Sequence, residues 1–234
     1  KWGGNSNRRT SGSSAADKLT GAYTETISCS GKKTSDDINI LFIGNSFTLH
    51  GYADYWWGKW GMAASEKEND FVHNTAAGLA TNSDVHLVAL NYFIWEKMTS
   101  DSAETFPIIN PYIKKNLDYV VIQLGENVSD FTNFQVDLEG LIDHVRDGAP
   151  DAQILVVGMA ANADVDNMKR AASESSGASF VDISNMTDWQ CGLGTTVKGD
   201  DGKDHVVEHE GVAGHPGDKG HRQIADRILA AINV

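Results

Sequence analysis

The chain has 234 residues, of which 41% are hydrophobic and 22% are charged, a size and composition that suit one globular domain with a sizeable core. Its formal net charge of −13 argues against nucleic acid or an anionic membrane as a partner, because phosphate groups are bound by basic surfaces. No apolar run approaches the roughly 18 residues of a membrane span. Neutral partners such as glycans fit this charge better.

Residues 1 to about 37 are polar, with Gly-rich and Ser-rich stretches, and are expected to be an N-terminal extension or linker to one domain over 38–234. The later part of this segment, 22–29, alternates enough to add an edge strand. Cys29 and Cys191 allow one disulfide, and two free thiols are equally compatible with so low a count.

The stretch 38–44 is apolar and rich in isoleucine, which indicates a buried strand. About twenty residues without proline follow it, so we expect a sharp turn into a helix over 52–67. Ser46 then stands at the carboxyl end of a parallel strand, where ligands bind in open α/β sheets. This position suits a nucleophile whose own N–H faces an oxyanion. The alternative is that Ser46 only caps the helix.

Aromatic residues follow Ser46 within the expected helix. Trp56 and Trp57 are adjacent and cannot both face the core of a helix, so at least one is expected to be exposed and to offer its flat ring to a sugar. The alternative is that Trp56 and Trp60, one turn apart, are ordinary core residues. His50 is a candidate pocket residue or else a solvated helix residue.

The rest of the chain alternates strands and helices, which predicts a mostly parallel sheet covered by helices on both faces, a three-layer α/β/α fold. Strands are expected over 85–90, 118–124, 153–158 and 179–183. Helices are expected over 93–98, 108–116, 134–145 and 165–174, with a last helix after residue 216. Glycines and charges dominate 192–214, which predicts a long loop or hairpin over the carboxyl edge of the sheet.

Two further motifs stand at the ends of expected elements. The strand over 118–124 is followed by Gly125, Glu126 and Asn127, which places Glu126 as a candidate substrate contact. A Gly-rich loop delivers His215 just before the last helix, where a general base could sit.

These motifs, Gly-Asn-Ser at 44–46, Gly-x-Asn at 125–127 and Gly-His-Pro-x-x-x-Gly-His at 214–221, together resemble those of the SGNH (GDSL-like) hydrolase superfamily over about residues 38–233. The resemblance implies a flavodoxin-like fold. It implies Ser46 as the nucleophile, His215 as the catalytic histidine and Asn127 as a side-chain donor to the oxyanion. It implies no metal or organic cofactor.

Two positions depart from the family pattern. The family usually has Asp three residues before the histidine, where this chain has Val212. The orienting acid is therefore expected to be Glu210, or else Glu208, and a backbone carbonyl could instead give a Ser-His dyad. The family also has a glycine after the second strand, and here the N–H of Phe93 is the candidate oxyanion donor.

We therefore expect a serine esterase that removes acetyl or similar acyl groups from a carbohydrate through an acyl-enzyme. The sugar substrate rests partly on resemblance, because residues 60–65 are similar to family members from polysaccharide-degrading bacteria. A secreted, periplasmic or cell-surface location is expected with it. The oligomeric state stays open.

Two other functions remain possible from the sequence. One is a glycan-binding module that kept the fold and lost the chemistry. The other is a zinc hydrolase using His205, Glu208 and His209, which match His-x-x-Glu-His. That motif requires a helix, whereas the two central valines and the flanking glycines favour a strand.

Overall fold

The computed structural model of the chain describes residues 2–3, 24–29, 37–81 and 83–232. A seven-stranded sheet in the order β1-β2-β4-β3-β5-β6-β7 forms its centre. The strands are β1 (Trp2–Gly3), β2 (Thr24–Cys29), β3 (Ile38–Gly44), β4 (Val85–Asn91), β5 (Tyr119–Gln123), β6 (Gln153–Val157) and β7 (Ser179–Val181). Strands β3 to β7 are parallel, while β2 is antiparallel to β4 and β1 is antiparallel to β2. The predicted, mostly parallel sheet is confirmed.

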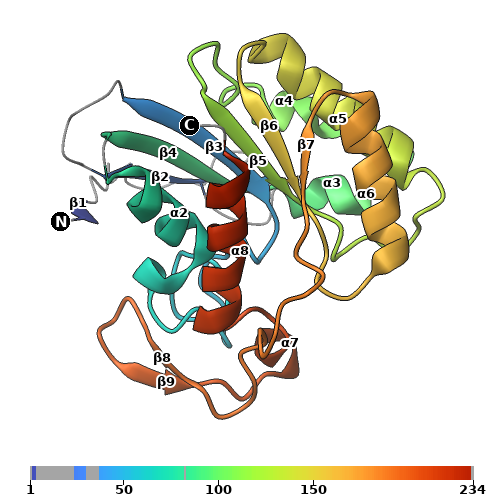
Figure 1. Cartoon of the computed structure of the whole chain (residues 1–234). Coiled ribbons are helices and arrows are strands. Elements are labelled where there is room, and N and C mark those ends of the chain that lie inside the picture. Colours follow the sequence, from blue (N-terminus) through green and yellow to red (C-terminus); the bar gives the residue numbers. More distant parts are fainter. Residues whose placement is uncertain (1, 4–23, 30–36, 82, 233–234) are drawn as a thin grey trace.

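Helices cover both faces of this sheet, with α2 and α8 together on one side and α5 and α6 on the other (Figure 1). The helices are α2 (Phe71–Leu79), α3 (Phe93–Lys97), α4 (Phe106–Ile109), α5 (Phe134–Gly148), α6 (Ala163–Ser175), α7 (Glu210–Ala213) and α8 (Asp218–Ala231), with 3₁₀ turns at Lys67–Asn69 and Ser102–Thr105. In the described part of the chain, none of them combines the length and apolar character that a membrane crossing requires.

Two apolar cores lie between the three layers, and β3 contributes to both. Leu41 and Ile43 pack on the side of α5 and α6, whereas Ile40 and Phe42 pack on the side of α2 and α8. Successive strand residues point to opposite faces, so a strand buried on both faces needs an unbroken apolar run. This is why the sequence of β3 identifies it so clearly.

The N-terminal segment adds strands to the sheet edge. The strand predicted over 22–29 is confirmed as β2, which pairs with β4, although β1 lies beyond it. The remaining extension predicted up to residue 37 lies almost entirely outside the described residues. Cys191 carries a free, half-buried thiol, so the structure forms no disulfide at this residue.

The helix predicted over 52–67 is wrong. The segment from Asn45 to Ala64 consists of turns with two isolated antiparallel bridges, His50 with Trp60 and Ala53 with Trp56. The indoles of Trp56 and Trp60 do not pack in the two main cores. They belong to a separate apolar cluster, named here the hairpin core. The hairpin core comprises Trp56, Trp60, Met62, Ala63, Ala64, Val197, Val207 and Val212. Tertiary packing thus overrides the helical spacing of the aromatic residues.

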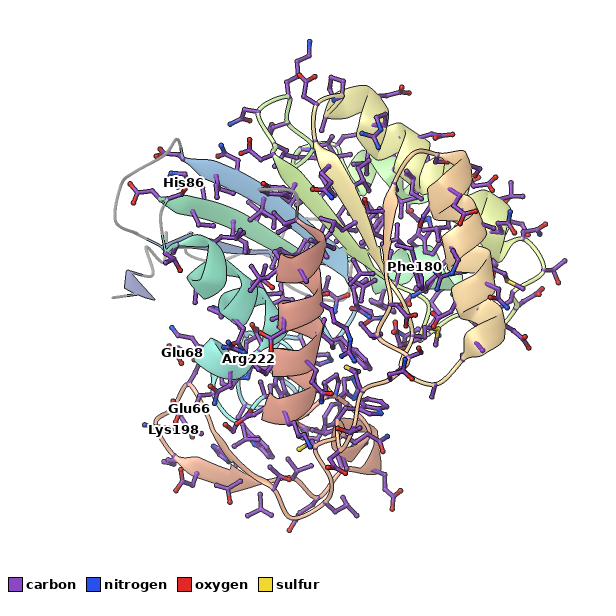
Figure 2. The ribbon with its side chains drawn as sticks, in the orientation of Figure 1. Glu66, Glu68, His86, Phe180, Lys198 and Arg222 are labelled. Carbon is purple, nitrogen blue, oxygen red and sulfur yellow. The ribbon has the colours of Figure 1, made fainter. Side chains whose placement is uncertain are left out.

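The hairpin predicted within 192–214 forms from β8 (Thr196–Lys198) and β9 (Asp204–Val206). The N–H of Lys198 donates to the carbonyl of Ser65 at 2.8 Å, and Figure 2 shows the side chains of Lys198 and Glu66 where the hairpin meets this loop. The hairpin and its core fix the start of the loop that leads through α7 to His215.

Candidate active site

A cleft of about 210 Å³ opens at the carboxyl ends of β3, β4 and β5. The chain leaves β3 for β4 on one side and later takes up β5 on the other side. Such a switch point is where open α/β sheets bind ligands. The cleft is lined by Ser46, His50, Asn91, Phe93 and Asn127.

Asn45 shapes the turn that presents Ser46. Its side-chain oxygen accepts the N–H of Phe47 at 3.0 Å, and its carbonyl accepts the N–H groups of Thr48 and Leu49, each at 3.0 Å. Ser46 therefore lies in one tight turn and not at the N-terminus of a helix, which corrects the expected turn into a helix and the helix-capping alternative. Among the described residues, no group accepts a hydrogen bond from the Ser46 N–H.

Gly44 allows this turn to fold back against β5. A Cβ at this position would lie 1.9 Å from Oγ1 of Thr48 and 2.9 Å from the carbonyl oxygen of Gln123. The Thr48 hydroxyl donates to the Gln123 side chain at 3.0 Å. The glycine that precedes Asn45 is thus needed for a close approach of backbone and side chains.

His215 meets Ser46 from the opposite end of the sequence. Its Nε2 lies 2.7 Å from the Ser46 Oγ, and its Nδ1 lies 2.6 Å from the carbonyl oxygen of Gly211. A carbonyl only accepts, so Nδ1 carries the proton and Nε2 is left to accept from the serine hydroxyl. The Phe47 ring packs beside the imidazole with centroids 5.1 Å apart.

The prediction that Glu210 orients His215 is wrong. Helix α7 is a single turn that brings the Gly211 carbonyl, four residues before His215, to Nδ1. The side chains of Glu210 and Glu208 are exposed. The structure therefore shows the alternative arrangement, in which a backbone carbonyl holds the imidazole of a Ser-His pair.

The environment of His215 keeps the imidazole neutral. Burial lowers the pKa of His215 to about 4, the Gly211 carbonyl opposes this shift, and His221, His50 and His209 add to it. A neutral imidazole with an unprotonated Nε2 is the form that can accept a proton from serine.

Asn127 follows β5 and lines the same cleft as Ser46. Its Nδ2 donates to Oε2 of Glu96 at 2.7 Å and its N–H lies 3.3 Å from Oε1 of the same carboxylate. A side-chain amide has two hydrogens on nitrogen, so one remains for a group in the cleft. The N–H of Phe93 instead donates to the side-chain oxygen of Asn91 at 3.1 Å, which corrects its expected role as an oxyanion donor.

The predicted substrate-binding tryptophans differ in exposure. Trp56 is fully buried in the hairpin core, so the core alternative is confirmed for it and its role as a platform is wrong. Trp57 is half-buried, and one face of its ring stacks on His205 with the ring centroids 4.5 Å apart. Trp57 lines two clefts, one of about 410 Å³ shared with Tyr52, Ala53, Trp56, Asp200 and Asp201, and one of about 240 Å³ shared with Asp54, Tyr55, Val206, Glu208 and His209.

Two other predicted contacts lie near Ser46. His50 lines the cleft, and its Nδ1 lies 2.6 Å from the carbonyl of Gly51. Burial lowers the pKa of His50. Oε2 of Glu126 accepts from Nδ2 of Asn45 at 2.7 Å and from Nε2 of Gln123 at 2.8 Å. Glu126 thus binds Asn45 in the serine turn and Gln123 at the end of β5.

The residues of the zinc pattern do not share a helix. His205 lies in β9 with Nε2 3.0 Å from Asp201, and His209 stacks on Tyr55 at 4.4 Å. Within the described ranges, no group of three or more His, Cys, Asp or Glu side chains is arranged to hold a metal ion.

Asn45, Asn91 and Glu96 belong to the site, although sequence reasoning gave none of them a role. Asn45 had a visible signal, because it lies inside the Gly-Asn-Ser motif. Glu96 had a weaker one, as an acidic residue in the apolar segment of α3, where it is 1% exposed.

No protein-family model and no curated protein sequence matches the chain. Its fold matches solved structures. An extracellular lipase from Streptomyces rimosus superposes with a TM-score of 0.54 and 12% identity, over 83% of this chain and 100% of the lipase. A phospholipase A1 from Streptomyces albidoflavus gives 0.54 and 14%, over 83% and 99%. A GDSL-like lipase from Bacteroides uniformis gives 0.52 and 10%, over 84% and 95%. The chain therefore has the three-layer fold of the SGNH, or GDSL-like, hydrolases.

Proposed function

We propose that the protein is a serine ester hydrolase. The observation that carries this proposal is the pair of hydrogen bonds on His215, from Ser46 Oγ to Nε2 at 2.7 Å and from Nδ1 to the Gly211 carbonyl at 2.6 Å. This geometry is that of a nucleophile beside a general base with a defined tautomer. It lies in a cleft at the carboxyl edge of the sheet.

The reaction proceeds through an acyl-enzyme. Ser46 Oγ attacks the ester carbonyl while Nε2 of His215 takes the hydroxyl proton, and the imidazolium then protonates the departing alcohol. Water enters, loses its proton to Nε2 and attacks the acyl-enzyme carbonyl. The imidazolium then returns the proton to Ser46 Oγ as the acid departs, which restores the serine hydroxyl and the neutral base. The Gly211 carbonyl stabilises the imidazolium in both halves.

Two donors serve the tetrahedral intermediate. The Ser46 N–H has no acceptor among the described residues, and the Asn127 amide has a second hydrogen beside the one bound to Glu96. Donors that are already oriented toward the developing oxyanion lower the barrier without having to reorganise during the reaction.

The substrate is an acetylated, or similarly acylated, carbohydrate. The two clefts that Trp57 lines combine aromatic rings with carboxylates, namely Asp200 and Asp201 in one and Glu208 in the other. Flat rings suit the apolar faces of sugars, and carboxylates accept hydrogen bonds from hydroxyl groups. Tyr55 connects this region to the cleft, because its ring lies 6.2 Å from that of His50.

Ser46→Ala tests the chemistry. We expect kcat on a small aryl acetate to fall by at least roughly 10⁴-fold, because the change removes the nucleophile. Thermal unfolding should be nearly unchanged. Substantial turnover by the folded variant would refute the mechanism. Wild-type protein that binds oligosaccharides but shows no hydrolysis above background would instead support the glycan-binding module.

Trp57→Ala tests the substrate class. We expect KM for an acetylated oligosaccharide to rise by roughly 10-fold, the loss of about 1.4 kcal/mol of binding, while kcat/KM for the aryl acetate stays the same. Equal losses on both substrates would point to damage of the hairpin core and would remove the support for a sugar subsite.

A further inference from the structure

A buried carboxylate that the proposed mechanism does not use lies next to the cleft. Glu96 is 1% exposed. Its Oε1 accepts from Asn45 Nδ2 at 3.0 Å and from the N–H groups of Gly125 at 2.5 Å and Asn127 at 3.3 Å. Its Oε2 accepts from Asn127 Nδ2 at 2.7 Å. One side chain thus joins the serine turn after β3 to the loop after β5.

All of these partners are donors. An ionised carboxylate only accepts and has about four lone-pair sites, so it satisfies all of them, whereas an amide in its place would turn a donor toward one of them. Both the main chain and the side chain of Asn127 are bound to this carboxylate, which fixes the plane of the amide and the direction of its second Nδ2 hydrogen.

Charged neighbours accompany Glu96. Burial raises the pKa of Glu96, and the nearby Glu126 raises it further, whereas its hydrogen bonds with Gly125, Asn127 and Asn45 oppose the shift. Lys169 of α6 is fully buried and interacts with both glutamates and with Asp166, and its Nζ donates to the Val157 carbonyl at 2.8 Å. A buried cation therefore balances the buried carboxylates.

The backbone around Asn127 reinforces the same orientation. Gly125 has a φ of 135°, which side-chain-bearing residues rarely adopt, and its N–H points at Glu96. Lys97, next to Glu96 on α3, donates from Nζ to the Asn127 carbonyl at 2.7 Å. Helix α3 thus contacts Asn127 through its side-chain amide, its N–H and its carbonyl.

We propose that Glu96 is a positioning residue that holds the Asn127 amide with one Nδ2 hydrogen directed at the oxyanion position beside Ser46. This inference rests on the proposed ester hydrolysis and adds to it the group that orients the donor. Its action on the oxyanion goes through Asn127, since Glu96 itself is buried and is not among the residues that line the cleft.

A double-mutant cycle tests the coupling. Asn127→Ala should lower kcat on an aryl acetate by roughly 10²–10³-fold. Glu96→Gln should lower kcat by roughly 10- to 100-fold with KM nearly unchanged, because a small misplacement of a catalytic group can cost as much as 10²-fold. In the Asn127→Ala background, Glu96→Gln should change kcat by less than about twofold. Losses that multiply, or a change confined to KM, would overturn the proposal.

A matched control separates positioning from general damage. Asp166 is another buried carboxylate with a raised pKa due to burial, and its Oδ1 accepts the Met159 N–H at 2.6 Å. Asp166 shares Lys169 with Glu96, but its hydrogen bond is to Met159 and not to the serine turn or Asn127. Asp166→Asn should therefore lower the unfolding temperature but leave kcat within about twofold of wild type. If Glu96→Gln does not fold, Glu96→Asp replaces it, since it keeps the charge and withdraws the carboxylate. An unchanged kcat in folded Glu96→Asp would overturn the proposal.

A spectroscopic readout separates this inference from the proposed function. In the ¹H–¹⁵N NMR spectrum of the wild type, one Asn127 Nδ2 proton should lie downfield because it is bound to a carboxylate, and Glu96→Gln or Glu96→Asp should shift it back. Unchanged Asn127 amide resonances would refute the positioning. An absence of ester hydrolysis in the wild type would refute the proposed function, and this spectrum would still decide whether Glu96 holds the amide.

Discussion

His215 takes its tautomer from a main-chain carbonyl and not from a carboxylate. A triad acid both orients the imidazole and stabilises its charge through a full negative charge. The Gly211 carbonyl orients it as well, through a hydrogen bond of 2.6 Å, but offers only a dipole. The effect of burial on the pKa of His215 is therefore larger than that of the Gly211 hydrogen bond, and it lowers this pKa to about 4. The site favours the neutral base over the imidazolium.

This lowered pKa predicts the acidic limb of the pH profile. Protonation of Nε2 removes the base, so kcat/KM for an aryl acetate should fall only as the pH drops toward about 4. An unperturbed histidine would give the limb near pH 6.5. The rate is measured over about pH 3.5 to 8 in parallel with circular dichroism, to exclude acid unfolding. A limb near 6.5 in folded protein would contradict the burial of His215.

Glu210 and Glu208 are the acids that the sequence predicts to orient His215. Glu210→Gln should leave kcat within about twofold of wild type, because the exposed Glu210 side chain is not the partner of Nδ1. Glu208→Gln serves as the matched control, with the same expected result. A loss of at least roughly 10²-fold in either variant would show that a glutamate acts as a triad acid.

The sequence singled out the residues that react in the proposed mechanism but not the groups that orient them. Ser46, Asn127 and His215 lie in short motifs at the ends of strands or just before a helix, where position alone indicates chemistry. Every residue has a carbonyl, so the choice of Gly211 depends on the single turn of α7, which sequence periodicity does not reveal. Glu96 is distant in sequence from all three motifs, and the pairing of β3 with β4 and β5 brings it beside Asn45 and Asn127.

At the scale of elements, the ends of the predicted strands lie within two residues of the observed ends, because most of these strands are apolar runs bounded by polar or glycine residues. The prediction of a helix over 52–67 was wrong. Trp56 and Trp60 have helical spacing, but that spacing does not say which surface they pack against. They pack under the β8–β9 hairpin, a partner more than 130 residues away in sequence.

The turn after β3 yields a prediction at this scale. Gly44→Ala should destabilise the protein by about 1–3 kcal/mol, because the added Cβ would overlap Thr48 and press on the Gln123 carbonyl. It should also lower kcat, since the same turn carries Ser46. Both effects are measured by urea unfolding and by aryl acetate turnover.

Gly140→Ala is the control for this substitution. Gly140 lies inside α5, and a Cβ there meets nothing within 4 Å. This change should stabilise the protein by about 0.5–1 kcal/mol and leave kcat unaltered. If Gly44→Ala behaved in the same way, the close approach at Thr48 would not constrain the turn.

At the scale of the molecule, the sheet order explains why residues so far apart in sequence form one site. The chain places β4 on one side of β3 and β5 on the other, so the segments after all three strands open into the same cleft. Solved structures with 10–14% identity share this fold. The arrangement thus depends on the apolar pattern of the strands, which many sequences satisfy.

The hairpin core has a consequence for how the proposed activity would be lost. Ser46 is attached to the sheet, whereas the loop before His215 is attached to the hairpin core through Val212. Small cooperative units of a protein can open at a lower free energy than the whole molecule. Opening of the β8–β9 hairpin and the hairpin core alone would move His215 away from Ser46 while the sheet stays folded. Heat would then inactivate the protein before the sheet melts, and amide hydrogens of β8 and β9 would exchange with solvent ahead of those in β3 and β5.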